Sequence, residues 1–596
     1  MPTLAVPRPE YPRPQFVRPD WLNLNGQWQF EIDPGDSGLE RGLLTRELAN
    51  TILVPFAPES SLSGVHQTDF LNAVWYRRQV NVPPAWAGRR LLLHFQACDY
   101  DTTVWVNGQE VGRHRGGYTP FTCDLGLANP AQPLSITVRA RDDHRALGPK
   151  GKQSARSANY GCMYTRTTGI WQTVWLEPVP EVALRRPRLT PDVGHHTIRL
   201  DQPLSANRPG HQIRAILRDA GVVVADVTAP ADIDFCAHAD LVIPPAHVKL
   251  WAPGQPHLYD LDLQLLDAAG KVIDQVASYA ALRSVAIDGQ KVLLNGRPVF
   301  QRLVLDQGFY PDGIYTAPSD EALCHDIELS LAAGFNGARL HQKVFEERFL
   351  YHADRLGYLC WGEFPDWGCN LGGPEGDNQQ PEASFITQWL EELERDYSHP
   401  CIVGWCPLNE TAQKITDRLT RLDDVTRGMF LAAKAMDPTR PVLDASGYAH
   451  RVPESDLYDS HDYEQEPRKL AQNHDGLAQG RPFVNRSGPQ GDISLAYRGQ
   501  PYFVSEFGGI WWNPQAGQDE ASWGYGQRPR NLDEFYDRFD RLCATLLDNP
   551  RMFGYCYTQL TDVYQEQNGI YHFDRSAKFD LARLRASQAR PAASET

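Results

Sequence analysis

Two glutamates follow buried, strand-like runs in the C-terminal half of the chain, where carboxyl groups can perform acid–base and nucleophilic chemistry. Glu410 follows the run CIVGWCP with Asn409 beside it, and Glu506 follows YFVS and precedes Gly508 and Gly509. Breaking a glycosidic bond requires an acid that protonates the leaving oxygen and a carboxylate on the other face of the sugar. Spacing alone leaves a purely structural role open, because barrels often carry glutamates at strand ends.

Polar side chains also follow the other strand-like runs of this half. From about residue 299, eight runs alternate with predicted helices, the pattern of a TIM barrel, whose chemistry lies at the C-terminal ends of its strands. We therefore expect the polar residues at these ends to line one site. They are Asp306, Gln307, Arg339, His341, Glu363, Asn409, Glu410, Asp444, His461, Tyr463, Glu506, Thr558 and Asp562.

The helices of this region have recognisable ends. Ser319 is a typical N-cap for a helix over 320–333, and Gly334 can adopt the left-handed conformation that ends helices. Further helices are expected near 346–356, 385–397, up to about 436, and 534–547. Residues 288–596 are therefore predicted to form a C-terminal TIM (β/α)8 barrel, and only the Ala/Arg/Ser-rich end after Leu584 is expected to be disordered.

The first half of the chain consists of short alternating runs broken by turn residues. Residues 1–180 are predicted to form a jelly-roll-like β-sandwich. The dipeptides Asn25-Gly26 and Asn107-Gly108 are expected to form hairpin turns. Residues 181–287 have the length and pattern of an immunoglobulin-like β-sandwich. The chain is thus predicted to be multidomain, with two sandwiches followed by a barrel.

Composition argues against several classes of protein. The 596 residues carry a net charge of -16 and a sequence pI near 5.6, with scattered basic residues, which disfavours nucleic acid as a partner. No apolar stretch approaches the ~18 residues of a membrane span, and the N-terminus lacks the pattern of a signal peptide. Eleven cysteines without CxxC pairs predict buried thiols in a reducing compartment. We therefore expect a cytoplasmic protein without a membrane partner, and a homo-oligomer stays open.

The motifs WCPLNE and YFVSEFGG, in this order and about one hundred residues apart, resemble those of glycoside hydrolase family 2, the group of β-galactosidases, β-glucuronidases and β-mannosidases. The resemblance covers nearly the whole chain. LNGQWQF, VPFAPES, VWYRRQV and GIWQTVWLEP look like the family's sugar-binding sandwich, and LWAPGQPHLYDL looks like its immunoglobulin-like middle domain. The resemblance implies a retaining glycosidase that acts on a terminal β-linked sugar.

The resemblance assigns roles to particular residues. Glu410 matches the general acid/base, Glu506 the nucleophile, and Asn409 the residue that hydrogen-bonds the sugar 2-hydroxyl. Tyr463 resembles the tyrosine that contacts the nucleophile, and Arg339 the arginine that pairs with it.

The same match, together with the chemistry of the groups, sets expectations for the surroundings. An arginine would keep Glu506 charged while a less solvated Glu410 stays protonated. His461 lies two residues before Tyr463, on the same side of a strand. Glu363 is expected either to bind the sugar or to neutralise Arg339.

Several positions depart from the family's pattern and leave the sugar open. Gln342 occupies the position of the usual histidine, with His341 and Lys343 beside it. EQNGIYHFDR lacks the Asn-x-Lys motif of β-glucuronidases, although Lys343 offers another route to an acidic sugar. GCMYTRTTGI lacks the aspartate that galactosidases present, and Asp306 replaces a His-Glu pair. We expect β-galactosides or sugars of the same anomeric geometry, such as α-L-arabinosides, with β-glucuronides and β-mannosides as alternatives.

Other interpretations remain open at this point. A non-catalytic carbohydrate-binding protein on the same scaffold is the first, and a metal-dependent barrel hydrolase is the second. No HExxH motif or Cys/His cluster is present, so no catalytic metal is implied. The two-glutamate mechanism implies no organic cofactor. An oxygen-only Mg²⁺ or Na⁺ site stays open. Trp511, after the nucleophile motif, is expected either to stack on the sugar or to pack in the core.

Overall fold

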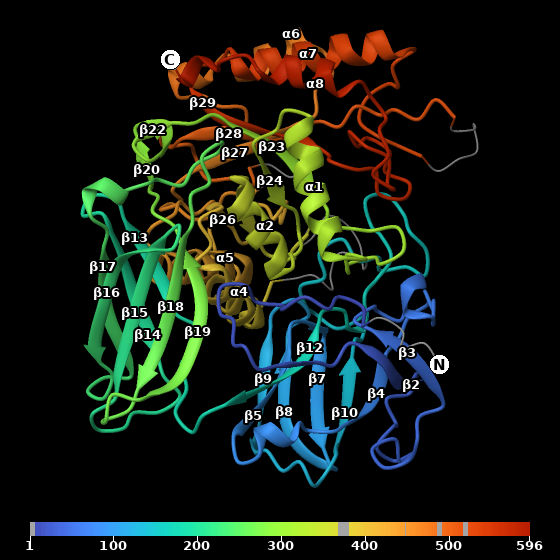
Figure 1. The fold of residues 1–596 in the computed structure, drawn as a ribbon. Coiled ribbons are helices and arrows are strands. Elements are labelled where there is room, and N and C mark those ends of the chain that lie inside the picture. Colours follow the sequence, from blue (N-terminus) through green and yellow to red (C-terminus); the bar gives the residue numbers. More distant parts are fainter. Residues whose placement is uncertain (1–5, 368–380, 448, 486–491, 516–521, 596) are drawn as a thin grey trace.

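The structure is a computed structural model. It describes residues 6–367, 381–447, 449–485, 492–515 and 522–595. The strands fall into three groups in chain order. In Figure 1 the first group is blue and the second green, and both lie below the C-terminal part, which carries most of the helices.

The first group consists of two antiparallel sheets and a short two-stranded ladder. One buried apolar cluster takes side chains from both large sheets, because alternate residues of each strand face inward. The first sheet contains β1 (Leu22–Asn23), β12 (Val174–Val179), β5 (Arg90–Phe95) and β9 (Phe121–Leu127). The second contains β3 (Asn50–Val54), β2 (Gly26–Ile32), β4 (Ala73–Val80), β10 (Leu134–Arg141), β7 (Asp101–Val106) and β8 (Gln109–Arg115), and β11 (Gly169–Ile170) pairs with β6 (Cys98–Asp99).

Only one of the two predicted hairpin turns forms. Asn107 and Gly108 have φ values of 52° and 79° and join the antiparallel strands β7 and β8, as expected. The prediction for Asn25-Gly26 is wrong, because β1 pairs with β12 and β2 belongs to the other sheet. The Asn25 side chain accepts a hydrogen bond from the backbone of Val174 (3.2 Å), which ties the crossing segment to β12 instead.

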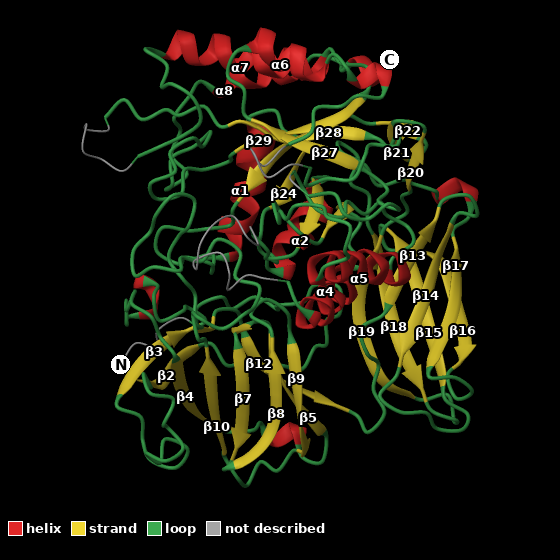
Figure 2. Cartoon of the chain, turned by 180° about the vertical axis from the view of Figure 1, so that it is seen from behind, coloured by secondary structure: helices red, strands yellow, loops and turns green. Residues whose placement is uncertain are grey.

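The second group also consists of two antiparallel sheets around one apolar cluster. Figure 2 shows its strands running side by side, away from the first group. One sheet contains β13 (Arg188–Asp192), β14 (Thr197–Pro203) and β17 (Cys236–Val242). The other contains β16 (Val222–Pro230), β15 (Gln212–Asp219), β18 (Tyr259–Leu266) and β19 (Val272–Ala280), and a small sheet of β20 (Val285–Asp288), β21 (Lys291–Leu294) and β22 (Arg297–Pro298) follows.

The C-terminal part contains a parallel sheet of seven strands instead of the eight expected. The fifth predicted strand, 441–445, forms only isolated parallel bridges, Trp405 with Val442 and, just beyond it, Asn409 with Ser446. The strand order is β26 (Ile402–Cys406), β25 (Leu359–Glu363), β24 (Gly337–Leu340), β23 (Gln301–Asp306), β29 (Met552–Thr558), β28 (Tyr502–Gly508) and β27 (Tyr458–Asp462). The sheet therefore brings β23 beside β29, the first strand beside the last.

The predicted helices all form. Ser319 caps the first of them by accepting a hydrogen bond from the backbone of Ala322 (3.3 Å). Among the described residues, two short helices were not predicted. Residues 585–595 are not disordered, since the chain continues as a helix and Glu595 then pairs with Arg302 (3.1 Å). The helices are α1 (Asp320–Ala332), α2 (Glu347–Leu356), α4 (Ala383–Asp396), α5 (Arg421–Met436), α6 (Pro467–His474), α7 (Leu532–Leu547) and α8 (Leu581–Gln588).

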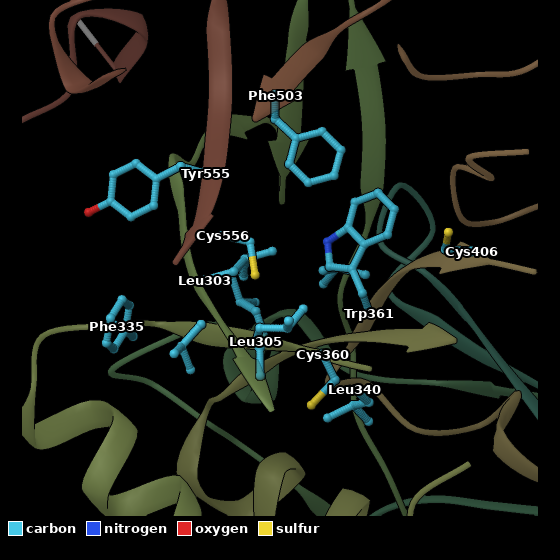
Figure 3. Packing of buried hydrophobic residues seen from close by; sticks show 14 of the residues in the cluster. Leu303, Leu305, Phe335, Leu340, Cys360, Trp361, Cys406, Phe503, Tyr555 and Cys556 are labelled. Carbon is cyan, nitrogen blue, oxygen red and sulfur yellow. The ribbon is translucent and has the colours of Figure 1, made fainter. Parts of the chain in front are cut away.

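Large apolar side chains fill the interior of the parallel sheet. Figure 3 shows Trp361 and Phe503 facing each other across it, with ring centroids 5.2 Å apart. Glycine is required beside them, because a Cβ on Gly404 would lie 2.9 Å from the Trp361 ring. This packing fixes the strands whose C-terminal ends carry the polar residues described below.

Two further expectations concern thiols and membranes. The ten cysteines of the described residues are free, and most are buried, as predicted. Among the helices of the described residues, none is both long and apolar enough to cross a membrane.

Candidate active site

The two glutamates meet at the C-terminal edge of the parallel sheet. Glu506 lies within β28 and is buried, whereas Glu410 lies on the loop after β26, in a left-handed backbone conformation with φ of 50°. A carboxylate oxygen of Glu410 lies within 4.8 Å of one of Glu506. Retaining glycosidases separate their two carboxyl groups by ~5–5.5 Å, and inverting enzymes by ~6.5–9.5 Å. The approach of these oxygens therefore favours the retaining geometry.

Three side chains hold the Glu506 carboxylate. Arg339 Nη1 donates to Oε1 at 3.1 Å, and His461 Nε2 lies 3.4 Å from the same oxygen. The Tyr463 hydroxyl donates to Oε2. Burial and the negative charge of Glu506 raise the pKa of Tyr463 well above its ordinary value, so the phenol keeps its proton and remains a donor.

Arg339 is the centre of this arrangement and is completely buried. Besides Glu506 it contacts the Asn409 amide oxygen (3.0 Å), the Ser505 carbonyl (2.8 Å) and the Glu363 carboxylate. A buried guanidinium requires carboxylate partners and filled hydrogen bonds. Of the two roles considered for Glu363, neutralising Arg339 is the one that these contacts support.

Glu410 has a different set of partners. His461 Nδ1 lies 2.6 Å from Oε1, and Trp367 Nε1 donates to Oε2 at 2.8 Å. Burial raises the pKa of Glu410, but the hydrogen bond and charge of His461, with help from Trp367 and Lys152, outweigh burial and bring that pKa below its ordinary value. The expectation that low solvation keeps Glu410 protonated is therefore wrong.

His461 carries the proton that Glu410 lacks. Burial lowers the pKa of His461, yet Glu506 and Glu410 more than offset it and raise that pKa above its ordinary value. Its Nε2 also lies 2.9 Å from the Ser446 hydroxyl, which is hydrogen-bonded to Asp459 (2.8 Å). His461 pairs directly opposite Glu506 in the register of β27 and β28, which explains why it reaches both glutamates.

His341 and Asn409 also lie at this site. His341 Nδ1 lies 3.1 Å from Glu363, and burial, with the positive charge of Lys152, lowers the pKa of His341 well below its ordinary value, so it is neutral. Asn409 donates from Nδ2 to the Gln342 amide oxygen at 3.3 Å. The amide of Asn409 thus bridges Arg339 and Gln342.

Two predicted site residues take other positions. Asp306 accepts a hydrogen bond from the Gly308 backbone (2.9 Å), and burial, with the charge of Asp326, raises its pKa to about 7. Trp511 donates to Ser522 (3.0 Å). Within the described ranges, no hydrogen bond or ion pair joins either residue to Glu410 or Glu506.

Lys343 does not provide the predicted route to an acidic sugar. Its ammonium donates to the carbonyls of Gly308 (2.5 Å) and Tyr315 (2.8 Å) and lies among aromatic rings. Burial lowers the pKa of Lys343 to about 7. The Lys343 ammonium is therefore already bound by groups of the protein itself and does not face a substrate.

Several residues of the site were missed from the sequence. Trp367 follows Glu363 by four residues and binds Glu410, and Tyr525 stacks on Tyr463 with ring centroids 3.4 Å apart. Lys152 belongs to the first group of strands, and its charge acts on both catalytic candidates. Side chains that arrive on long loops leave no periodic signal, so sequence reasoning could not place them.

Glu410, His461 and Glu506 bring ligand atoms within 4.8 Å of one another, so a metal must be considered. Both ring nitrogens of His461 already lie against protein oxygens, and the Arg339 cation contacts Glu506. A dication there would face the guanidinium, which disfavours a catalytic metal at these residues. The arrangement suits general acid–base and nucleophilic chemistry instead.

Comparison with known proteins identifies the family. The pattern described as "Glycosyl hydrolases family 2, sugar binding domain" matches residues 22–129, and "Glycosyl hydrolases family 2" matches residues 197–283. The chain belongs to glycoside hydrolase family 2. A β-glucuronidase of Paenibacillus borealis is 25% identical over 446 residues, which cover 70% of this chain and 72% of the relative. A β-galactosidase of Thermoanaerobacter pseudethanolicus is 24% identical over 405 residues, 65% of this chain and 50% of that protein.

Solved structures agree with the family at the level of the fold. This family 2 chain aligns with the Bifidobacterium dentium β-glucuronidase, solved with coumarin-3-O-glucuronide, at a TM-score of 0.77 and 20% identity over 97% of the chain and 98% of that structure. The β-glucuronidase of Dictyoglomus thermophilum gives a TM-score of 0.76 at 18% identity, over 98% of this chain and 99% of the other. The multidomain architecture is therefore that of family 2.

Proposed function

We propose that this family 2 enzyme is a retaining exo-glycosidase with Glu506 as nucleophile and Glu410 as general acid/base. The approach of their oxygens to within 4.8 Å is the observation that carries the proposal. The permanent cation Arg339 on Glu506 and the titratable His461 on Glu410 support this division of roles. The alternative of a non-catalytic carbohydrate-binding protein has no use for such a pair.

In the first step Glu506 attacks the anomeric carbon while Glu410 gives its proton to the departing oxygen, which produces a covalent glycosyl-enzyme. Asn409, which Arg339 and Gln342 orient, is in place to accept or donate a hydrogen bond at the sugar 2-hydroxyl. In the second step Glu410 takes a proton from water, and the water oxygen replaces Glu506 at the anomeric carbon. Two displacements return the original configuration.

The proton that Glu410 donates is shared with His461. One proton is shared across the 2.6 Å contact between His461 Nδ1 and Glu410 Oε1. The lowered pKa of Glu410 and the raised pKa of His461 both favour the form in which His461 carries this proton. When a sugar covers the site, transfer along this contact makes Glu410 the acid and His461 neutral. We propose His461 as a positioning residue that stores the catalytic proton.

We further propose the domain division 1–180, 181–287 and 288–596, as a jelly-roll-like sandwich, an immunoglobulin-like sandwich and a TIM barrel. Two antiparallel sheets around a common core support each sandwich, and seven parallel strands with alternating helices support the barrel. On this division, the first domain supplies a loop to the active site of the third.

Hydrolysis of a panel of nitrophenyl glycosides by the purified protein tests this function. We expect release of nitrophenol from at least one β-linked sugar or α-L-arabinoside, and proton NMR should detect the retained anomer as the first sugar formed. The galactoside or arabinoside preference stays a prediction, and relatives named β-glucuronidase support a uronide. Glu506→Gln should abolish hydrolysis, whereas Glu534→Gln, in the first turn of α7 and paired with Arg530, should not. A first product of inverted configuration would contradict the proposal.

A further inference from the structure

Lys152 lies on the long loop between β10 and β11, which crosses from the first group of strands to the active site. The neighbouring Gly151 donates to the Pro365 carbonyl (2.7 Å), and Trp523 donates to the Gly161 carbonyl (2.7 Å). Tyr164, on the same loop, donates its hydroxyl to Glu566. The loop is thus fastened to the barrel on both sides of the site, and Lys152 is held in a fixed place.

The Lys152 ammonium is buried but has no hydrogen-bonded partner. The residue is 7% exposed, and within the part of the chain that the structure describes neither an acceptor nor a carboxylate is bonded to Nζ. The nearest recorded contact is the Tyr164 ring, whose centroid lies 5.9 Å from Nζ. A buried charge that lacks hydrogen bonds is costly, and proteins normally pair such groups.

Lys152 nevertheless remains charged. Burial lowers its pKa, but Glu566, Glu506 and Glu410 raise it to a net value above the ordinary one. Lys343 and Lys578, two other lysines of the barrel with buried side chains, have lowered pKa values and bonded acceptors, which are two carbonyls for Lys343 and Asp562 for Lys578. Lys152 therefore differs from these lysines because it is charged and has no bonded acceptor, so it can bind an anionic group of a ligand.

We propose that Lys152 binds the carboxylate of a terminal uronic acid in the sugar subsite, so that a uronide is the substrate class. The inference rests on the proposed glycosidase function and deepens it. The segment EQNGIYHFDR carries Glu566 and no lysine, whereas Lys152 enters the same site from the first domain. A carboxylate of the sugar would supply the acceptor that the ammonium lacks.

This inference can be tested with pairs of substrates that differ only at C6 of the sugar, which is a carboxylate in one and a hydroxymethyl group in the other. We would compare kcat/KM for nitrophenyl β-D-glucuronide with that for the β-D-glucoside, and for the β-D-galacturonide with that for the β-D-galactoside. The wild type should prefer the acid of at least one pair. Lys152→Met should reduce kcat/KM for that uronide by about 10- to 150-fold, the value of a charge-assisted hydrogen bond, and change kcat/KM for the neutral partner much less. Lys152→Arg should retain part of the preference.

Lys150→Met is the matched control, because Lys150 lies two residues away on the same loop and donates to the Asp143 carbonyl (3.1 Å). It should leave the ratio of uronide to neutral activity unchanged. If Lys152→Met does not fold, the inference can be tested by measuring the Tm of the wild type with added sugars. D-glucuronate or D-galacturonate should then raise Tm more than D-glucose or D-galactose.

Three results would overturn the inference. They are a wild type that prefers the neutral sugar of both pairs, an equal loss on both substrates in Lys152→Met, and equal stabilisation by acid and neutral sugars. An equal loss with a shifted pH profile would mean that Lys152 only adjusts Glu410. These outcomes leave the glycosidase function standing, whereas a protein that cleaves no glycoside of the panel contradicts the function itself.

Discussion

The two glutamates occupy contrasting environments although they face the same space. Glu506 lies inside a β-strand and accepts hydrogen bonds from Arg339, whose charge does not change at any working pH, and from the Tyr463 hydroxyl, with His461 farther away at 3.4 Å. Glu410 lies on a loop with a left-handed backbone and is paired with His461, which titrates. A nucleophile needs a constant charge, whereas an acid/base must change its protonation twice in each turnover. The contrast teaches that the partner of each carboxylate reveals its role better than its burial does.

Removal of the nucleophile should have the largest effect. Glu506→Ala leaves Arg339 and Tyr463 in place but removes the group that forms the glycosyl-enzyme, so kcat should fall by at least about 10⁴-fold with every leaving group. Steady-state rates with phenols of different acidity would measure this. A residual rate that recovers with the best leaving groups would mean that Glu506 is not the nucleophile.

Removal of the permanent cation should come next. Arg339→Met removes the permanently charged partner of the buried carboxylates Glu363 and Glu506, so we expect the free energy of unfolding to fall by about 3–5 kcal/mol and kcat to fall by about 10²–10³-fold. Denaturant unfolding and kinetics would measure both changes. Arg575→Met, which breaks a partly buried pair with Asp326 away from both glutamates, should reduce stability but not kcat. An equal loss of kcat in the two variants would remove the special role of Arg339.

Loss of the tyrosine hydroxyl should be milder. Tyr463→Phe removes one hydrogen bond to the nucleophile carboxylate, worth about 1.5–3 kcal/mol, so kcat/KM should fall by about 10- to 150-fold. The control is Tyr458→Phe, five residues earlier on β27, whose hydroxyl donates to the Leu495 carbonyl (2.9 Å) instead. Equal rates for Tyr463→Phe and wild type would contradict the contact with Glu506.

Replacement of His461, the partner of Glu410, should change the pH dependence of kcat/KM. The charged His461 lowers the pKa of Glu410 and, in the proposed mechanism, holds the proton that Glu410 donates. The pair loses this proton at the raised pKa of His461, so the basic limb of the kcat/KM profile should move downward in His461→Asn, where Glu410 holds the proton alone. His572→Asn, at the protein surface, should not move it. A basic limb that stays in place or moves upward would show that His461 does not store the proton.

Much of this site could be predicted from the sequence because barrel strands bring their ends together. Arg339, His461 and Glu506 end adjacent or facing strands, and their meeting follows from parallel register. Glu410 itself lies beyond its strand, yet the run before it is buried and strand-like. Each of these residues belongs to or follows a buried, strand-like run that can be recognised in the sequence.

Loops and local competition explain what could not be predicted. Lys152 reaches the site from more than 250 residues before Glu410, and no periodic pattern connects them. Asp306 ends a strand as expected, but its side chain turns to the Gly308 backbone instead of the glutamates. Asn25-Gly26 has the composition of a hairpin turn, although pairing of its strands with different partners decides otherwise. Tertiary contacts thus decided the positions of Lys152 and Asn25-Gly26, whereas a local hydrogen bond decided that of Asp306.

The configuration of the product that Glu410→Ala forms with azide tests the division of roles most directly. With a dinitrophenyl glycoside of a sugar that the enzyme accepts, the leaving group needs no proton, so the glycosyl-enzyme should form and accumulate while its hydrolysis is slow. Azide should then attack from the side that Glu410 vacated and release a glycosyl azide of retained configuration. An inverted azide from Glu410→Ala, with the retained azide arising from Glu506→Ala instead, would show that the two roles are reversed.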